Sequence, residues 1–416
     1  MNRSFLPCLL ALSFTLLFAA CAPHSKLIGN PQIPYPPVTP PQIGDILHLR
    51  TGQYVHEEEM LTAATDSRIV YVAETHDNPA SHRLQLDLLK SLAQRYPGRT
   101  AVAMEMFTPA QQVVLDAWIA GEIDEKSFLK LWYNGWKMDI TYYRDILDYC
   151  RSEQIPILGI NAEKSLVKAV GRKEFTELPS EEQAQLPTIL DMNDPYQLAS
   201  TTAFFGGHAQ GPMLAGFQRV QTLWDETMAE NIVRFRASPQ GDDFHLLVLA
   251  GGNHVRNGFG IPRRVFRSLP LSYTLIGNEE LEVSEAKKKE AYMDVTLPEY
   301  PMPAYDYLVY TRYEELAKTD EVKLGVVFDE KDGQLIVNEI LPESVAARGG
   351  VQSGDVLRSL DGEPLVESFD LIYALKQKKI GELGKLIVER DSATLTLDLT
   401  YAPAPAMGIS HKEAGK

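Results

Sequence analysis

Cysteine is scarce in this chain, and its positions limit the possible chemistry. The 416 residues contain three cysteines, of which Cys8 and Cys21 belong to an apolar N-terminal stretch. If that stretch is cleaved and Cys21 is modified, Cys150 is the remaining free thiol, and no internal disulfide can form. We therefore expect the domains to be stabilised by their hydrophobic cores, and Cys150 to be an ordinary helix residue in "ILDYCRSE" rather than a catalytic thiol.

Positive charge is also in short supply. Lysine and arginine number 40 against 56 aspartates and glutamates, which gives a formal net charge of -16. A nucleic-acid partner usually requires a basic face, so we expect none here. The length exceeds that of one ordinary domain and predicts two.

An apolar run long enough to span a bilayer is missing too. "FLPCLLALSFTLLFAAC", which follows Arg3, is too short to do so comfortably and is typical of a secretory signal. Ala19 and Ala20 precede Cys21, and this pattern resembles a bacterial lipoprotein signal. The resemblance implies a signal peptide over 1–20, lipidation of Cys21 and attachment to the outer membrane, either facing the periplasm or at the surface. An ordinary signal peptide with an incidental cysteine is the alternative.

The next segments predict a tether and an α/β domain. Residues 21–41 are rich in proline, which favours an extended spacer. Over 42–319, nearly continuous apolar runs alternate with longer amphipathic stretches, as in a mostly parallel sheet flanked by helices. The predicted strands are "RIVYVAE", "TAVAMEM", "IPILGIN", "FHLLVLAGG" and "SYTLIG", with "PAYDYLVYTRYEE" as a further one.

Residues 320–402 have a different pattern, and 403–416 form a tail. "KLGVVFDEKDGQLIVNEILP" predicts a hairpin that turns at Asp332-Gly333, followed by a short helix and "GVQSGDVLRSLDGEPL". These motifs resemble a PDZ domain of the type found in exported bacterial proteases, a small β-barrel or sandwich with helices. The resemblance implies that a peptide C-terminus or protein partner binds to backbone N–H groups of Leu324, Gly325 and Val326.

Polar side chains follow several of the predicted strands in the first domain. Parallel α/β sheets bind ligands at the carboxyl ends of their strands, so these side chains should share one rim. They are Glu74 and His76 after the first strand, Glu105 after the second, Asn161 after the third, and Asn253 and His254 in "LAGGNHVRNGFGIPRR". Two carboxylates and two imidazoles are costly to gather at a buried edge without a ligand or a network, so the group is a candidate site.

This candidate rim permits more than one chemistry. Glu74, His76, Glu105 and His254 could bind a divalent metal ion and activate water, or could act as an acid/base set without a metal. The spacing matches no known zinc motif such as HExxH.

Several ordered motifs resemble the ChaN-like haem-binding lipoproteins. They are "AETHDNPASHRLQLDLL", "AMEMF", "WKMDITYYRDILDYCRSEQIPILGINA", "QTLWDETMAENI" and "LAGGNHVRNGFGIPRRV", and the likeness covers about residues 42–312. The resemblance implies an outer-membrane lipoprotein that binds haem for iron acquisition and can form a homodimer around it. The wider group includes TIKI-type metalloproteases and erythromycin esterase-like enzymes, so hydrolysis remains an alternative.

The family suggests tyrosine as the haem-iron ligand, since tyrosinate is a hard anion suited to ferric iron. Tyr143 and Tyr142 in "DITYYRDIL" are the candidates here, with His208 and His254 as further haem contacts. Three functions follow from the sequence. The chain is expected to bind haem or iron, or to be a metal-dependent hydrolase, or to be a scaffold whose PDZ domain carries the function.

Overall fold

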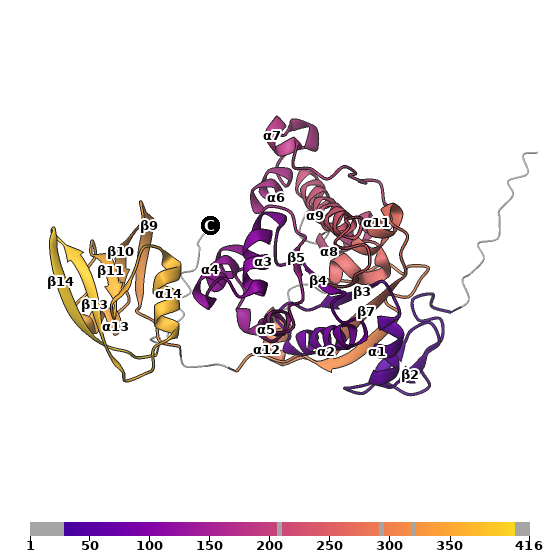
Figure 1. Ribbon diagram of the computed structural model, residues 1–416, viewed down its shortest axis with the longest axis horizontal. Coiled ribbons are helices and arrows are strands. Elements are labelled where there is room, and N and C mark those ends of the chain that lie inside the picture. The colour runs from indigo at the N-terminus through magenta and orange to yellow at the C-terminus, as the bar shows by residue number, and fades with distance from the viewer. Residues whose placement is uncertain (1–28, 206–209, 291–294, 318–320, 404–416) are drawn as a thin grey trace, which may run out of the picture.

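Two separate β-sheets organise the protein. The structure is a computed structural model that describes residues 29–205, 210–290, 295–317 and 321–403. Within these residues, an eight-stranded sheet has the order β2-β1-β8-β7-β3-β6-β4-β5, and a six-stranded sheet has the order β14-β13-β11-β10-β9 with β12 paired to β11. Figure 1 shows the two sheets in two distinct bodies, the second formed by the C-terminal part of the chain.

The first domain has the mostly parallel sheet that the sequence predicts. Strands β3, β4, β5, β6, β7 and β8 pair in parallel, while β1 and β2 add an antiparallel edge. The strands are β1 (Ile46–His48), β2 (Gln53–Val55), β3 (Ile69–Glu74), β4 (Thr100–Met104), β5 (Ile157–Gly159), β6 (His245–Gly251), β7 (Tyr273–Glu282) and β8 (Tyr307–Arg312).

Helices cover both faces of this sheet. The α-helices are α1 (Glu57–Thr65), α2 (Pro79–Arg95), α3 (Gln112–Ala120), α4 (Glu125–Gly135), α5 (Arg144–Ser152), α6 (Lys164–Val170), α7 (Ser180–Gln183), α8 (Pro195–Phe205), α9 (Pro212–Arg236), α10 (Gly252–Val255), α11 (Ile261–Ser268) and α12 (Glu285–Glu290). Short 3-10 turns are η1 (Pro109–Gln111), η2 (Ile140–Tyr142), η3 (Phe175–Glu177) and η4 (Arg256–Gly258). No helix in the described ranges is long and apolar enough to cross a membrane.

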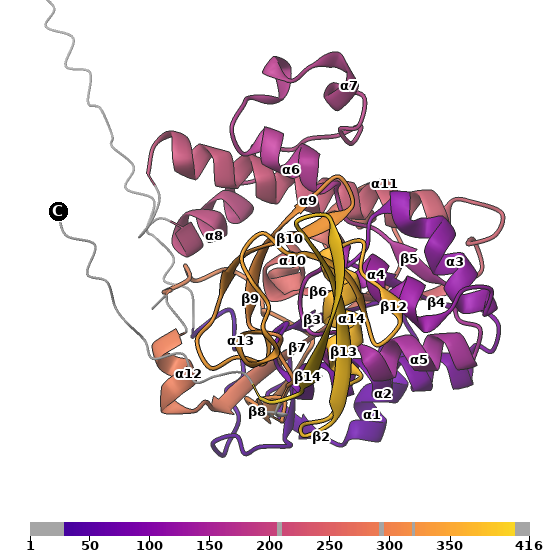
Figure 2. The same ribbon diagram turned by 90° about the vertical axis from the view of Figure 1, so that its left-hand side faces the viewer.

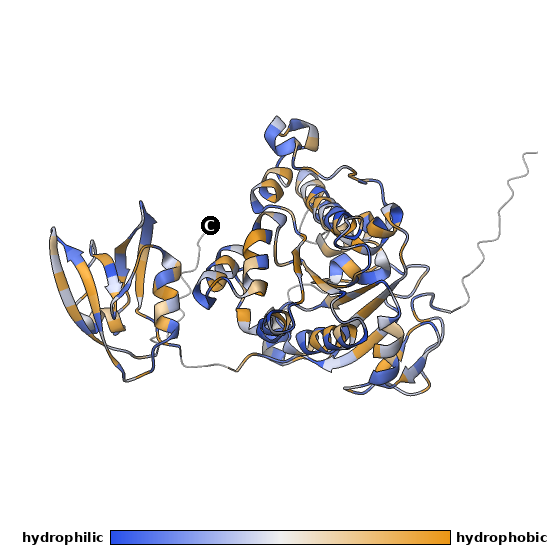
Figure 3. Ribbon diagram, in the orientation of Figure 1, coloured by the Kyte–Doolittle hydropathy of each residue, from blue (hydrophilic) through white to orange (hydrophobic). Residues whose placement is uncertain are grey.

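Alternating residues of each central strand reach opposite helical layers. Val70 and Val72 of β3 pack in a cluster with residues of α2, α3 and α5, whereas Ile69 and Tyr71 pack with residues of α9 and α11. Successive side chains of a strand point to opposite faces, so a strand buried on both sides must be apolar throughout. Figure 3 accordingly shows the hydrophobic residues concentrated on the central strands, with hydrophilic residues on the outer faces of the helices.

Local signals set the helix ends that lead away from the strands. The Asn78 side chain accepts a hydrogen bond from the Ala80 backbone N–H at 3.1 Å, and Pro79 begins α2. Gly121 ends α3 with φ +75°, a left-handed conformation that glycine adopts at little cost. The charged stretch after residue 278 extends β7 to Glu282 and then forms α12.

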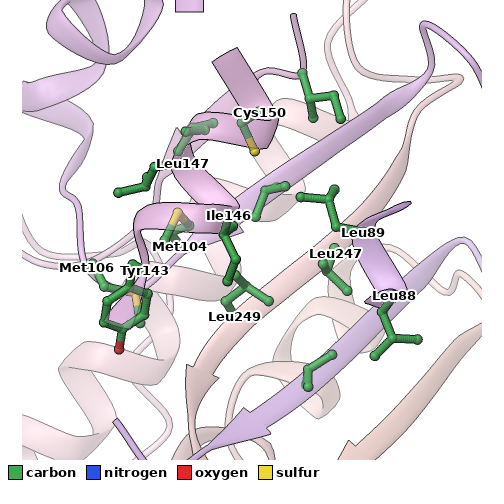
Figure 4. Close-up of a cluster of buried hydrophobic side chains, with 14 of the residues drawn as sticks. Leu88, Leu89, Met104, Met106, Tyr143, Ile146, Leu147, Cys150, Leu247 and Leu249 are labelled. Carbon is green, nitrogen blue, oxygen red and sulfur yellow. The ribbon is translucent and has the colours of Figure 1, made fainter. Parts of the chain in front are cut away.

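Cys150 lies in the larger apolar cluster of the first domain. It is a buried residue of α5, and burial raises the pKa of its thiol. Figure 4 shows it with Ile146 and Leu147, while the ring of Tyr143 lies beside Met106 with its hydroxyl oxygen directed out of the group. Cys150 is therefore a helix residue, as the sequence predicted, and it lies in the core.

The second domain is antiparallel and small. It contains β9 (Val326–Lys331), β10 (Gln334–Ile340), α13 (Val345–Gly349), β11 (Val356–Leu360), β12 (Glu363–Pro364), α14 (Ser368–Lys376), β13 (Leu383–Arg390) and β14 (Ala393–Thr400). Asp332 and Gly333 form the predicted hairpin turn, both with positive φ. Figure 2 views the molecule from the side of this domain.

Candidate functional site

The carboxyl ends of β3, β6 and β4 meet at one edge of the parallel sheet. Glu74 at the end of β3 pairs with Gly251 at the end of β6, and the Glu105 backbone N–H donates to Leu249 of β6 at 3.1 Å. A Cβ at Gly251 would lie 3.0 Å from His76 Nε2 and 3.6 Å from Glu105 Oε2. The predicted rim therefore exists, and its side chains approach the backbone so closely that a larger residue at Gly251 would require the His76 ring to shift.

Glu74 and His76 form the first carboxylate–imidazole pair. His76 Nδ1 lies 2.6 Å from Glu74 Oε1, and Gln85 donates to the other carboxylate oxygen. Burial alone would raise the pKa of Glu74, but hydrogen bonding and charge from His76 lower it. Burial would likewise lower the pKa of His76, but Glu74 raises it. The Glu74 side chain is fully buried whereas that of His76 is 35% exposed, so the imidazole forms the accessible end of the pair.

Glu105, His254 and Asp225 form a second, deeper group. His254 Nδ1 lies 2.6 Å from Asp225 Oδ1, and His254 Nε2 lies 3.5 Å from Glu105 Oε1. Burial alone would lower the pKa of His254, but these two carboxylates raise it to about 10. Burial would raise the pKa of Glu105, but His254 and the Gly251 N–H, which donates at 2.7 Å, contribute to lowering it to about 2. A buried imidazolium between two carboxylates is the expected state at neutral pH.

Further buried polar groups hold this second group in place. Gln221 and Gln197 both donate to Asp225 Oδ2, the former at 3.1 Å. Gln197 in turn accepts from Arg264, a fully buried residue of α11 whose Nε lies 3.1 Å from Glu226. The network therefore ties helices α8, α9 and α11 to the end of β6, and it fixes the orientation of the His254 ring.

The two tyrosines predicted as haem-iron ligands occupy different surroundings. Tyr143 is fully buried, and its hydroxyl donates to Glu74 Oε1 at 2.5 Å. Burial and the charge of Glu74 raise the pKa of Tyr143 well above its usual value, so the phenol stays protonated. Tyr142 is half-buried, and burial and the Asp77 carboxylate raise its pKa as well. Tyr143 therefore contributes a hydrogen bond to the buried carboxylate of the Glu74–His76 pair.

A cavity of about 810 Å³ adjoins the rim on the side of α4. Its walls come from the end of β4, from α3, α4 and α6, and from Trp224 of α9, and they are mostly apolar. Glu105 and Trp136 belong to these walls, and the Trp136 ring packs edge-on against His76 with the ring centroids 5.1 Å apart. Glu105 therefore places the charged group of the strand ends at the cavity, and Trp136 places the cavity next to the partly exposed imidazole of His76.

Lysines supply the positive charge of this cavity. Lys130 of α4 and both Lys164 and Lys168 of α6 contribute to its lining. Lys164 also donates to the Gly135 carbonyl and so connects α6 to the end of α4. The cavity thus combines an apolar interior with cationic groups, a combination suited to a flat apolar ligand that carries carboxylates.

The four residues predicted as metal ligands come together as two pairs rather than as a cage. Each imidazole is bonded to a carboxylate, and among the residues the structure describes no group of three or more His, Cys, Asp or Glu side chains is placed to hold a metal ion. Asn161 lines the cavity, where its side chain donates to the Glu105 carbonyl at 2.8 Å. His208 lies outside the described residues.

The predicted carboxylate-binding loop begins the second sheet. Gly325 has φ +78°, and the carbonyls of Leu324 and Gly325 accept hydrogen bonds from Ala346 and Leu341, at 2.8 and 2.9 Å respectively. Val326 then starts β9, which stands at the end of its sheet and pairs with β10. An edge strand next to such a loop is the arrangement to which an extended peptide can add.

Each of the two domains matches a known protein family. Residues 60–265 match the family model "Haem-binding uptake, Tiki superfamily, ChaN", and residues 322–400 match the PDZ domain model. The first domain is a ChaN-like domain, and the second is a PDZ domain.

Individual relatives match each domain separately. A "Probable periplasmic serine endoprotease DegP-like" from Pseudomonas fulva (strain 12-X) is 36% identical over 77 residues, which are 18% of this chain and 16% of that protein. A "Probable CtpA-like serine protease" from Staphylococcus haemolyticus is 23% identical over 156 residues, 36% of this chain and 32% of the relative. The chain thus spans about a sixth of the length of the DegP-like relative and a third of the other.

Among solved structures, one titled "Cofacial heme binding to ChaN of Campylobacter jejuni" is 17% identical to this chain. It covers 64% of this chain and 95% of its own, with a TM-score of 0.48.

Sequence reasoning missed Asp225 and the cavity of the ChaN-like domain. Asp225 lies in "QTLWDETMAENI" on α9, where it is fully buried, and its signal is a carboxylate on the apolar face of an amphipathic helix. The lysines of α4 and α6 carry no comparable signal, because exposed lysines are common on any helix. Their shared position becomes visible once the two helices are placed around one cavity.

Proposed function

We propose that the ChaN-like domain binds haem in the cavity beside the strand-end rim, while the PDZ domain binds a peptide C-terminus or a protein partner. The observation that carries this proposal is that the 810 Å³ cavity is lined by Glu105 of the rim and by Trp136, whose ring packs against His76. A mostly apolar cavity of this size is within the range of cofactor sites in proteins.

The residues present fit a haem group in two respects. The apolar walls suit the macrocycle. The lysines at the cavity suit its two propionates.

His76 is the side chain best placed to hold the haem iron. Its Nδ1 is bonded to a buried carboxylate, which fixes the ring and directs Nε2 to the rim. Metal-ligating histidines generally have this carboxylate partner on the other nitrogen. Tyr143 is a weaker candidate because its hydroxyl is buried and already donates to Glu74. Bound haem would supply a Lewis-acidic iron centre, and the chain would bind it, orient it and shield it from water.

The cellular role follows from the N-terminal segment and belongs to the same proposal. Cys21 would carry a lipid anchor in the outer membrane, and the proline-rich residues 21–41 would separate the ChaN-like domain from the lipid. Haem bound there would serve iron acquisition, and two copies could share a haem-binding face as a homodimer. Mass spectrometry of the processed N-terminus, with Cys21→Ser as control, tests the anchor.

Hemin titration of the purified chain tests the haem-binding function. The parent should show a saturable Soret band at micromolar hemin, and His76→Ala should weaken binding and alter the band. Lys168→Glu should weaken binding without altering the band, because it acts on the propionates. Lys90→Glu makes the same charge change at an exposed position of α2 and should leave affinity unchanged. A parent chain that shows no saturable band refutes haem binding.

A metal-dependent hydrolase is the second candidate, because the hydrogen-bonded Asp225, His254 and Glu105 form an ordered acid/base group. Metal analysis of protein purified without chelator, followed by peptide and ester substrates, tests this function. Glu105→Gln and His254→Ala should abolish any hydrolysis found. A metal-free, inactive parent protein excludes this candidate.

A further inference from the structure

Helix α4 separates the cavity of the ChaN-like domain from the PDZ domain. Ser127, Lys130, Leu131 and Asn134 of α4 line the cavity. Other positions of the same short helix contact α14 of the PDZ domain, which lies next to α4 in Figure 1. A change in the position of α14 would therefore act on a wall of the cavity.

The contacts between α4 and α14 combine charge with aromatic packing. Lys126 Nζ lies 3.1 Å from Asp370 Oδ1 and 5.5 Å from the centre of the Tyr373 ring. The rings of Tyr133 and Phe369 have their centroids 5.7 Å apart. Both helices therefore contribute cationic or aromatic side chains to one continuous contact.

Two more ion pairs extend this contact at its ends. Lys130, which also lines the cavity, forms an ion pair with Glu367, the residue that precedes α14. Lys376, at the end of α14, lies 3.7 Å from Asp139, just before η2. The PDZ domain thus holds the ChaN-like domain on both sides of the loop that leads from α4 towards Tyr143.

Within its own domain, α4 packs on the larger apolar cluster mainly through two aromatic side chains. Phe128 and Trp132 are its buried residues, and both belong to the larger apolar cluster. A helix of three turns depends on packing for its stability rather than on intrinsic propensity. The α14 contact supplies a second packed side, so it should reduce the local opening of α4.

Helix α14 also borders the edge strand of the PDZ domain. The Ser368 backbone N–H donates to Glu330 of β9 at 3.0 Å, while Leu371 and Leu375 belong to the PDZ core. A peptide that pairs with β9 would therefore lie against the helix that contacts α4. Helix α14 therefore contacts both the edge strand β9 and helix α4, which forms a wall of the cavity.

We propose that α14 of the PDZ domain braces α4 and thereby sets the affinity of the cavity for its ligand. The part of this proposal that concerns haem affinity rests on the proposed function, whereas the bracing of α4 does not. Coupling between the two sites is reciprocal, so a ligand in the cavity changes the affinity of the PDZ groove by the same factor.

Charge reversal at two lysines of this contact tests the proposal in the full chain. The double variant Lys126→Glu and Lys376→Glu opposes Asp370 and Asp139, and neither lysine lines the cavity. Its control, Lys90→Glu with Lys385→Glu, makes the same charge changes at exposed positions, one in each domain. Hydrogen exchange of the α4 amides and the hemin dissociation constant are measured for both.

The test variant should raise hydrogen exchange in residues 125–135 by about tenfold and weaken hemin binding by about fivefold, within the range of measured couplings. The control should change both by less than about twofold. Unchanged exchange overturns the bracing, and raised exchange with unchanged hemin affinity overturns the coupling. If the parent does not bind hemin, haem binding fails as a function, and the exchange measurement still decides whether α14 braces α4.

Discussion

Removal of the Asp225 charge should destabilise the ChaN-like domain strongly. Asp225 is fully buried, and its carboxylate binds the His254 imidazolium at 2.6 Å and accepts from Gln221 and Gln197. In Asp225→Asn, the cation would keep Glu105, 3.5 Å away, as its remaining anionic partner. The new amide would also place a donor group beside the donating amides of the two glutamines.

The expected loss of unfolding free energy in Asp225→Asn follows from the behaviour of buried ion pairs. Loss of one partner from such a pair costs about 3–5 kcal/mol, and the asparagine retains one acceptor, so we expect a loss of about 3 kcal/mol. For a domain of this size that corresponds to a fall in Tm of roughly 6–12 °C. The exposed Asp243, 3.0 Å from Arg99, is the matched control, and Asp243→Asn should leave the stability nearly unchanged, because water screens an exposed ion pair.

Tryptophan fluorescence in urea measures this effect in the domain concerned. All four tryptophans, Trp118, Trp132, Trp136 and Trp224, lie in the ChaN-like domain, so unfolding of the PDZ domain does not contribute to the signal. A loss below about 1 kcal/mol for Asp225→Asn would refute the assignment of a charged, buried group.

The Asp225–His254 pair should also make the stability of the ChaN-like domain depend on pH in a defined direction. The folded pKa of His254, about 10, lies above its usual 6.5, so the stabilisation is complete below pH 6.5 and is lost as pH rises through 10. The difference between the parent and Asp225→Asn should therefore shrink from pH 7 to about pH 9. A difference that is constant over this interval would contradict the raised pKa.

Three further predictions concern the rim and the PDZ loop. Glu74→Gln should weaken hemin binding by about tenfold in a spectroscopic titration, because His76 loses the carboxylate that orients it; equal affinity would contradict this role. Hemin affinity should rise with pH through the raised pKa of His76, since a ligating nitrogen must lose its proton, and His76→Ala should abolish that rise. In the PDZ domain, Gly325→Ala would place Cβ 2.2 Å from Ser344 Cβ, whereas Gly333→Ala, at a position that also has positive φ, would make an ordinary van der Waals contact of 3.7 Å with Val366 Cγ1. Calorimetry should show the first variant less stable than the second by at least about 1 kcal/mol, and equal stability would refute the steric argument.

The sequence predicts the sheet and its rim well because both depend on local patterns. Continuous apolar strands such as β3 and β6 require cover on both faces, and parallel pairing brings their carboxyl ends together. Glu74, His76, Glu105 and His254 therefore share one edge, as expected. The positions of residues at strand ends can therefore be predicted before the packing of the helices is known.

The cavity and the partners of the rim depend instead on helix packing. Asp225 is far from His254 in sequence, and only the position of α9 brings the two within 2.6 Å. Tyr143 shows the opposite case, because a tyrosine near a helix start can face a ligand or the core, and packing of α5 against the sheet places it in the core. The contact between α4 and α14 joins two domains, and no local sequence pattern predicts it.

Spectroscopy of the ferric haem complex tests the central claim most directly. Electron paramagnetic resonance of the hemin-loaded parent, His76→Ala and Tyr142→Phe identifies the axial ligand. If haem binds beside the rim as proposed, the parent should show histidine ligation that is lost in His76→Ala and retained in Tyr142→Phe. A tyrosinate spectrum that persists in His76→Ala would contradict the proposed position of the haem.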